Sequence, residues 1–300
     1  MEHYLVIDCS YMLHRTFFAG WKSSGSEELD AGLALHSAFV TFNKYYNKYN
    51  PTKVVCAFDR PNWRAEYTKS DMCLSEKQYK ANRRKNMTSS EKRRYDRFKD
   101  HVTEFEDLVK EYTSMICLAA DMLEADDLIA GFCQMHPDDK TTILSADQDM
   151  IQLLRNPNVS IVDPMTDKAR VCDDIDWFLF LKYIRGDTGD NVQSAFPRVR
   201  ETRIRKAFED EFERLSLMNE VWTNNVSKEF RVGDLFEENK MLMGLSDQPA
   251  PVKELMTHTI KSGMESHGKF NYFKFLKFCG KHNLVNIKKG ADSYIKLLSC

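Results

Sequence analysis

Residues 4–8 read Tyr-Leu-Val-Ile-Asp, a short apolar run that ends on a carboxylate, and the chain repeats this pattern. Residues 53–59 read Lys-Val-Val-Cys-Ala-Phe-Asp, and residues 141–149 pass from Thr-Thr-Ile-Leu into Asp147 and Asp149. Short runs of β-forming residues with polar boundaries predict buried strands. Each of these strands is expected to deliver a carboxylate at its C-terminal end.

Helical patterns separate these strands, for example over residues 9–18 and 100–112. Strands that alternate with helices predict an α/β fold with a central, twisted, mostly parallel sheet and helices on both faces. Open sheets of this class bind ligands outside the carboxyl ends of their strands. The acids that end the strands, beginning with Asp8 and Asp59, are therefore expected to meet at one edge.

A third acidic stretch follows another apolar run. Residues 122–130 read Met-Leu-Glu-Ala-Asp-Asp-Leu-Ile-Ala and place Glu124, Asp126 and Asp127 side by side. Crowded carboxylates repel one another, which raises their pKa values and favours hard divalent cations with oxygen ligands. The alternative is that these acids decorate a helix N-terminus, where the helix dipole favours them.

The last acidic motif is the turn Gly-Asp-Thr-Gly-Asp-Asn at residues 186–191, whose glycines permit a tight turn that aims Asp187 and Asp190 at one point. So many acids predict two magnesium ions about 3.5 to 4 Å apart, which support in-line attack on a phosphodiester. Because these motifs offer carboxylates as ligands, without imidazole or thiolate ligands beside them, zinc is disfavoured, whereas Mn²⁺ can replace Mg²⁺.

Residues 60–97 are rich in lysine and arginine with interleaved aromatic residues, among them Trp63 and Tyr79. This mixture suits phosphate neutralisation combined with base stacking, the two terms that bind single strands without sequence preference. We expect this basic segment to project from the domain. The alternative is a solvated charged helix or loop.

Composition sets the outer bounds. The chain has 300 residues, 42% of them hydrophobic, a formal net charge of −2 and eight scattered cysteines. These values predict a globular cytoplasmic enzyme without a membrane segment or signal peptide. We expect an α/β domain over residues 1–185, including the basic segment, and a helical region over residues 186–300.

The ordered motifs resemble those of the flap-endonuclease family of structure-specific 5′ nucleases, the PIN-like 5′-3′ exonucleases. Order and spacing match across the first two thirds of the chain, and within the family the sequence is most similar to the bacteriophage RNase H branch. The resemblance rests on residues 6–8, 57–59, 79–83, 124–127, 145–149 and 186–191.

The resemblance implies that residues 1–185 form a nuclease domain whose basic segment, about residues 60–97, is a helical arch over the site, and that residues 186–300 bind duplex. It also implies a role for each matching residue. Asp8, Asp59, Glu124 and Asp126 are expected to hold the first magnesium ion, and Asp147, Asp149, Asp187 and Asp190 to shape the second site. Asp127 matches the motif but is expected to act less directly. Lys80 and Arg83 are expected to contact the scissile phosphate, Tyr79 to stack on a base, and Arg84 and Lys85 to bind the strand.

One departure affects duplex binding. Family members commonly follow the Gly-Asp-x-x-Asp-Asn turn with a glycine-rich helix-hairpin-helix and a potassium ion, whereas residues 192–200 lack those glycines. Duplex binding is therefore expected to rely on basic residues, which are Arg198, Arg200, Arg203, Arg205 and Lys206. The alternative is a solvated basic helix.

These expectations combine into a 5′-3′ nuclease that hydrolyses RNA primers and DNA flaps during phage replication or repair, in the host cytoplasm. Its substrates are DNA and RNA–DNA hybrids with a free 5′ end or flap, and the C-terminal helices are considered as a docking surface for a single-stranded-DNA-binding protein or another replisome component. One alternative is a non-catalytic fork-binding protein. A haloacid-dehalogenase-type phosphatase is disfavoured, because Ser10 stands where that class needs a second aspartate.

Overall fold

The computed structural model describes residues 1–20, 27–83 and 87–300 of the chain. It divides into two compact units, which are described separately. The first unit comprises Met1–Arg60, Met87–Val171 and Glu254–Cys300, and the second comprises Pro61–Asn86 and Cys172–Lys253.

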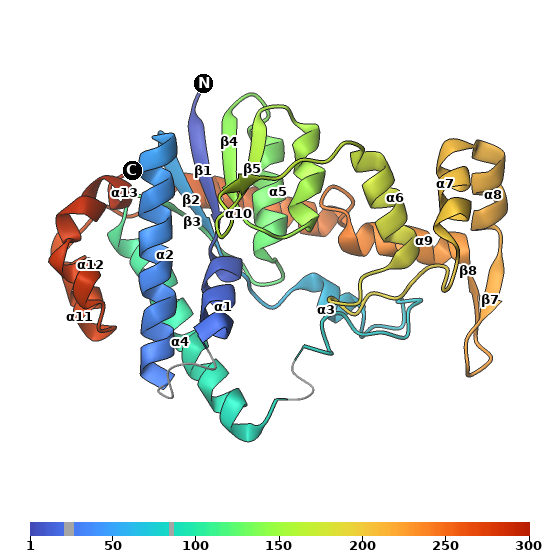
Figure 1. The fold of residues 1–300 in the computed structure, drawn as a ribbon, viewed down its shortest axis with the longest axis horizontal. Helices are drawn as coiled ribbons and strands as arrows, with labels where there is room; N and C mark the ends of the chain where they lie inside the picture. Colours follow the sequence, from blue (N-terminus) through green and yellow to red (C-terminus); the bar gives the residue numbers. More distant parts are fainter. Residues whose placement is uncertain (21–26, 84–86) are drawn as a thin grey trace. The chain divides into compact units, whose positions relative to one another are not determined.

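The first unit is built on a six-stranded sheet with the strand order β3-β2-β1-β4-β5-β6 (Figure 1). Every neighbouring pair is parallel except β5 and β6, which confirms the predicted mostly parallel sheet. The strands are β1 (His3–Asp8), β2 (Lys53–Ala57), β3 (Ile116–Leu118), β4 (Lys140–Leu144), β5 (Val159–Asp163) and β6 (Lys168–Ala169).

Helices cover both faces of this sheet, as predicted. Leu5 and Ile7 of β1 join the hydrophobic core that lies under α1, α2 and α4, whereas Tyr4 points to the other face and meets Phe132 of α5 at a ring-centroid distance of 4.9 Å. This alternation follows from the two-residue period of a strand. The helices are α1 (Cys9–Gly20), α2 (Glu27–Tyr49), α4 (Ser89–Tyr112), α5 (Ala125–Met135) and α10 (Ala250–Glu265), and the 3₁₀ helix η1 is Asp149–Arg155.

A close approach seats α10 on the face of α5. A Cβ atom at Gly131 would lie 2.9 Å from Ile260 Cδ1 and 3.0 Å from Met256 Cε, so a larger residue there would require the ends of these two side chains to move. The last helices pack on the opposite face, where Phe275 is fully buried beside Phe39. They are α11 (Tyr272–Lys281), α12 (Val285–Lys289) and α13 (Ile295–Leu298), with the 3₁₀ helix η2 at Ala291–Tyr294.

The second unit is mainly helical but includes a β-hairpin, which the prediction of a helical region over residues 186–300 omitted. Trp222 and Phe230 are cross-strand partners in this hairpin and stack at 4.9 Å, so an aromatic pair stabilises it. The elements are α3 (Trp63–Tyr67), α6 (Ile175–Arg185), α7 (Glu201–Glu209), α8 (Glu211–Met218), β7 (Val221–Thr223), β8 (Glu229–Arg231) and α9 (Val232–Met243).

The division into units does not coincide with the predicted boundary after residue 185. Helix α6 belongs to the second unit, and the C-terminal helices from Glu254 onward belong to the first, since they pack on α2 and α4. The predicted arch over residues 60–97 is also divided, because α4 begins at Ser89 in the first unit. Within the described ranges, no helix is both long and apolar enough to cross a bilayer.

Candidate functional site

Three neighbouring strands of the first unit lead into aspartates at the same edge of the sheet. Asp8 is the last residue of β1, Asp59 follows β2, and Asp147 follows β4. Because β2, β1 and β4 are adjacent and parallel, their carboxyl ends lie together. The structure therefore gathers these three predicted acids as the strand pattern required.

Asp8 is the most buried of the three, with an exposed fraction of 3%. Its carboxylate accepts hydrogen bonds from the Tyr11 backbone N–H at 2.9 Å and from the Ser145 hydroxyl at 3.0 Å. Burial raises the pKa of Asp8, and the nearby charges of Asp59 and Asp147 raise it further, while the two hydrogen bonds act in the opposite direction. A cation at this position would relieve that unfavourable environment.

Two serines organise these strand ends, and the sequence analysis assigned neither of them a role in the site. Ser145 Oγ donates to Asp8 and accepts from the Asp147 backbone N–H at 3.1 Å, whereas Ser10 Oγ accepts from the Asp59 backbone N–H at 2.7 Å. Both serines are buried. Their signal in the sequence is the mirrored spacing of Asp8-x-Ser10 and Ser145-x-Asp147.

The acids at residues 124–127 start helix α5, so the capping interpretation describes part of their role. Asp59 Oδ1 accepts from the Ala125 backbone N–H at 2.8 Å, and Asp127 Oδ2 accepts from the Glu124 backbone N–H at 3.2 Å. Glu124 and Asp127 are buried, whereas Asp126 is partly exposed. Asp127 thus holds the helix terminus, and its predicted indirect role toward a metal ion stays a prediction.

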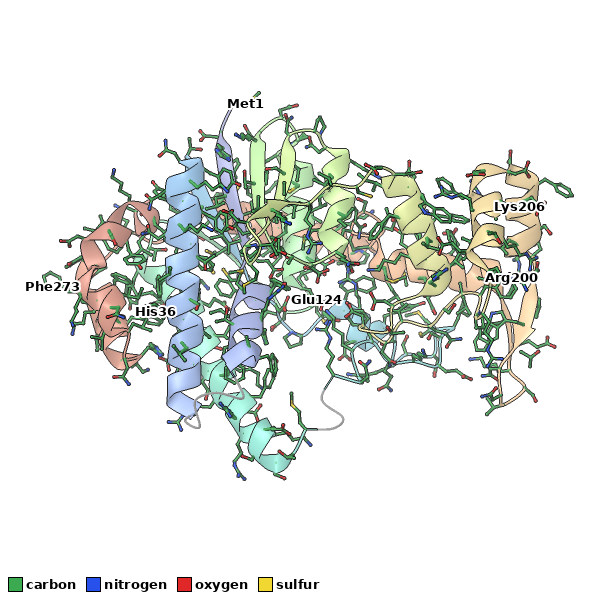
Figure 2. All side chains as sticks on the ribbon, viewed as in Figure 1. Met1, His36, Glu124, Arg200, Lys206 and Phe273 are labelled. Carbon is green, nitrogen blue, oxygen red and sulfur yellow. The ribbon has the colours of Figure 1, made fainter. Side chains whose placement is uncertain are left out.

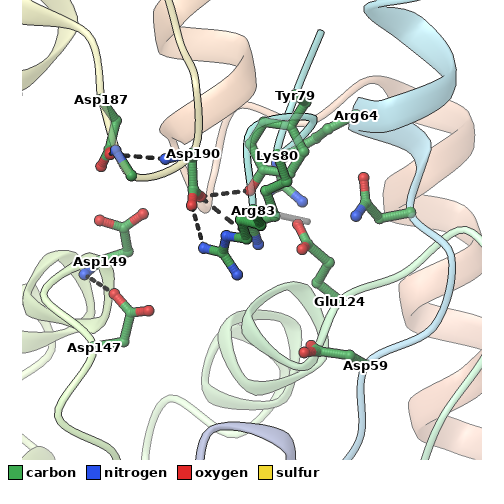
Figure 3. A network of polar contacts seen from close by, with 12 residues as sticks. Asp59, Arg64, Tyr79, Lys80, Arg83, Glu124, Asp147, Asp149, Asp187 and Asp190 are labelled. Atoms are coloured by element: carbon green, nitrogen blue, oxygen red, sulfur yellow. Dashed lines mark hydrogen bonds and ion pairs between the residues drawn. The ribbon is translucent and has the colours of Figure 1, made fainter. Parts of the chain in front are cut away.

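Asp147 and Asp149 form a short turn at the start of η1. The Asp149 backbone N–H donates to Asp147 Oδ1 at 2.9 Å, which Figure 3 shows as a dashed line. Both side chains are partly exposed. Across residues 1–20, 27–83 and 87–300, no three His, Cys, Asp or Glu side chains are close enough, as placed, to hold a metal ion.

In the second unit, residues 186–191 form the predicted tight turn. Gly186 has a φ of +66°, and a Cβ atom there would lie 2.6 Å from two backbone carbonyl oxygens, so only glycine fits. Asp187 Oδ1 accepts from the backbone N–H groups of Gly189 at 2.7 Å and Asp190 at 3.0 Å. Its other oxygen lies 3.3 Å from the Lys182 ammonium.

Asp190 lies among basic and hydroxyl groups of the basic segment. Tyr79 donates its hydroxyl to Asp190 Oδ2 at 2.8 Å, Lys80 Nζ lies 3.7 Å from the same oxygen, and Arg83 pairs with Oδ1 (Figure 3). Burial alone would raise the pKa of Asp190, but the charges of Lys80 and Arg83 outweigh burial, and the pKa is lowered. The acidic turn therefore anchors the basic segment within this unit.

The predicted nucleic-acid-binding residues have different environments. The Tyr79 ring, predicted to stack on a base, is only 7% exposed and packs beside Trp63. Arg84 and Lys85 lie outside the described residues. On the helical side, Arg198, Arg200 and Lys206 are exposed, whereas Arg203 pairs with Glu220 and the Arg205 guanidinium lies 3.7 Å from the centroid of the Trp177 ring.

A buried glutamate that the sequence analysis missed, Glu238, holds residues 67–75 of the basic segment. Glu238 of α9 accepts from the Tyr67 hydroxyl at 3.0 Å and from the backbone N–H groups of Leu74 at 2.6 Å and Ser75 at 2.9 Å. Arg64, also buried, donates to the Leu242 carbonyl at 2.6 Å. These contacts join residues more than 150 positions apart, so no local pattern predicts them.

Comparisons with known proteins agree with this architecture. A family model described as the 5′-3′ exonuclease N-terminal resolvase-like domain matches residues 3–176. The bacteriophage T5 D15 protein co-crystallised with metal ions has a TM-score of 0.63 and 18% identity, with 87% of this chain and 99% of that chain covered. The bacteriophage T5 D15 flap endonuclease in a pseudo-enzyme-product complex with DNA and metal ions has a TM-score of 0.62 and 18% identity, over 88% and 99% of the two chains.

A third solved structure, the T5 5′-exonuclease with bound divalent zinc ions, has a TM-score of 0.56 and 17% identity, over 88% of this chain and 92% of that chain. No curated protein sequence matches the chain. At these identities the solved structures establish the fold, while the family model covers more than half of the sequence. The resemblance read from the motifs is confirmed: the chain belongs to the 5′-3′ exonuclease family, with its N-terminal resolvase-like domain at residues 3–176.

Proposed function

We propose that this protein is a metal-dependent 5′-3′ nuclease that hydrolyses phosphodiester bonds of 5′ DNA flaps and of RNA primers paired to DNA. The observation that carries the proposal is the edge of the parallel sheet, where Asp8 is buried and its pKa is raised by burial, Asp59 and Asp147. Strongly perturbed pKa values cluster at functional sites, and a bound cation would offset the negative charge of these carboxylates. Family membership and the T5 structures that contain DNA and divalent metal ions support this proposal.

The available donors are all carboxylate oxygens, which fit magnesium or manganese. Asp8, Asp59, Glu124 and Asp126 are proposed to hold one ion, and Asp147, Asp149, Asp187 and Asp190 to hold or shape the second. Two such ions supply a nucleophile at neutral pH and stabilise the negative charge that develops on the phosphate. We propose magnesium as the resident metal and two as the number of bound ions.

The protein's own groups complete the proposed reaction. Ser145 and the Tyr11 backbone N–H donate to the Asp8 carboxylate, which favours its ionised form and fixes its orientation. Lys80 and Arg83 are proposed to donate to the scissile phosphate, which would replace Asp190 as their partner. The proposed biological role is primer removal during phage DNA replication, or repair.

The test is cleavage of a 5′-flapped duplex and of an RNA-primed nicked duplex, each labelled at the 3′ end of the cut strand. We expect products shortened from the 5′ side with Mg²⁺ and none with EDTA. Asp126→Asn should abolish cleavage and keep binding, whereas Asp121→Asn, an exposed neighbour outside the predicted set, should cut normally. Tight binding to forks without any cutting in Mg²⁺ or Mn²⁺ would identify a structure-specific binding protein instead.

A further inference from the structure

The C-terminal helices of the first unit carry a net positive charge, although the chain as a whole is slightly acidic. Residues 266–300 contain seven lysines, one aspartate and no arginine, although the whole chain has a net charge of −2. All seven lysines are exposed; they are Lys269, Lys274, Lys277, Lys281, Lys288, Lys289 and Lys296. The charge is therefore concentrated on the surface of α11 to α13.

Helix α11 presents these charges from a rigid base. On its inner face, Phe275 and Phe278 are buried. The Phe278 ring lies beside Phe105 of α4 and Phe39 of α2, at ring-centroid distances of 6.4 Å and 6.2 Å. On its outer face, Phe273 is 82% exposed, at the margin of these helices in Figure 2. The outer face is thus held in place by a packed core, while its own aromatic ring is left in solvent.

Phe273, Lys277 and Lys281 follow one another at four-residue spacing, so they form a single row on that outer face, with steps of about 6 Å along the axis. Gly280 follows Lys277 by three residues and so lies on the same face of α11. The Lys288 ammonium of α12 lies 3.7 Å from the position that a Cβ atom of Gly280 would take, so Lys288 adds its charge to this row. We call the surface of Phe273, Lys277, Lys281 and Lys288 the lysine face.

The lysine face has little acidic compensation. Glu104 of α4 pairs with Lys281 at 2.6 Å, and Asp292 accepts a hydrogen bond from Tyr272 at 2.8 Å. Lys277 and Lys288 form no ion pair with any residue that the structure describes. The helix dipole favours a lysine in the last turn, which accounts for Lys281. It does not account for the exposed Phe273 at the other end of the row.

We propose that the lysine face binds single-stranded nucleic acid, with Phe273 stacking on a base and Lys277, Lys281 and Lys288 neutralising phosphates. Lysine is depleted in protein–protein interfaces, whereas exposed lysines neutralise phosphates without regard to sequence, so these lysines favour sequence-independent phosphate contacts. An exposed ring beside phosphate-binding charges is the arrangement that binds single strands. This surface lies outside the candidate catalytic residues, so it extends the proposed function beyond the cleavage site.

The first experiment measures the binding of a fluorescent oligo-dT to the full chain in EDTA, at several salt concentrations, so that no cleavage is needed. Lys277→Ala/Lys288→Ala should weaken binding and reduce the slope of log affinity against log salt by about 1.4. The matched control is Lys140→Ala/Lys168→Ala, which removes two exposed lysines from elsewhere in the same unit and should leave the slope unchanged.

The second set of variants isolates stacking. Phe273→Ala should weaken oligo-dT binding about ten-fold, Phe273→Tyr should restore it, and neither should change the affinity for blunt duplex. An unchanged salt slope in the double lysine variant, or equal losses for duplex and single strand in Phe273→Ala, would overturn the proposal. So would displacement of oligo-dT by polyglutamate together with indifference to Phe273, which would assign the face to an acidic polypeptide. Because binding is measured without metal, this result is independent of whether the chain cleaves.

Discussion

Two aspartates that the sequence analysis assigned to the same metal-binding role, Asp8 and Asp190, have opposite surroundings. Asp8, at the sheet edge of the first unit, lies near two further acids, and its pKa is raised by burial and by those charges. Asp190, in the turn of the second unit, is partly buried, and Lys80 and Arg83 lower its pKa. One carboxylate is held where a negative charge is unfavourable, and the other where it is already neutralised.

The difference distinguishes an acid that stabilises the fold from an acid whose charge destabilises it. Asp190 contributes to stability through its basic partners and fixes the basic segment, so its charge is part of the fold. Among the residues that the structure describes, the hydrogen-bond donors to Asp8 are the neutral groups of Tyr11 and Ser145, and the charge of Asp8 costs stability. A residue retained at a cost to folding is expected to serve function.

The largest expected effect comes from removing the Asp8 charge. Asp8→Asn keeps the shape and the hydrogen-bonding atoms but removes a proposed metal ligand, so cleavage of a 5′ flap should fall about 1000-fold or more. The melting temperature measured in EDTA should rise or stay the same, because an unfavourable buried charge is gone. A variant that unfolds more easily than the wild type would show that Asp8 stabilises the fold.

The same substitution at Asp190 should change stability in the opposite direction. Asp190→Asn removes charge-assisted bonds from Arg83 and Lys80 and disturbs the hydrogen bond from Tyr79, so unfolding should become easier by about 2 kcal/mol. Asp247→Asn is the control in the same unit. Its ion pair with Lys240 is 3.8 Å long and more than a third exposed, so urea denaturation should show almost no change. Equal losses in the two variants would mean that Asp190 is not an anchor.

The sheet edge was predictable because its signal is local. Each strand is a short apolar run followed by an acid, as in residues 4–8 and 53–59, and the parallel order of an α/β fold brings such ends together. Helix α5 was predictable for the same reason, since Glu124 and the acids after it mark a helix start. The hairpin at β7 and β8 was missed because each of its strands has only three residues.

The contacts that fix the site were not predictable, because they join distant residues and involve side chains without a charge pattern. Ser145 meets Asp8 across 137 positions, and Glu238 meets Leu74 across 164. The pairing of Asp190 with Lys80 and Arg83 was also missed. The sequence analysis assigned Asp190 to a metal ion and the two basic residues to a phosphate, so it did not consider them as partners of one another. Sequence patterns located the functional groups, while long-range packing decided their partners.

A smaller effect should appear in the pH dependence of stability in EDTA. A carboxyl whose pKa is raised on folding contributes stability at low pH and loses it as the pH rises from about 4 through the raised value. Wild-type stability should therefore fall over this range by about 1 kcal/mol or more, and Asp8→Asn should flatten the fall. Asp190, with a lowered pKa, should act only as the pH falls below about 4. If Asp8→Asn leaves the profile unchanged, the raised pKa is not what limits stability.

The smallest effect should come from the hydroxyl that holds Asp8. Ser145→Ala removes a hydrogen bond that lowers the pKa of Asp8 and leaves the Asp147 backbone N–H without its acceptor, so stability above neutral pH should fall by about 1 kcal/mol. Ser10→Ala is a matched control, because Ser10 is also buried and accepts from the Asp59 backbone N–H, whereas Ser145 and not Ser10 is the hydroxyl that lowers the pKa of Asp8. Both variants should lose a similar amount of stability at pH 4, where Asp8 is protonated, and only Ser145→Ala should lose more as the pH rises. Parallel profiles for the two serine variants would mean that Ser145 supports the loop after β4 without acting on the Asp8 charge.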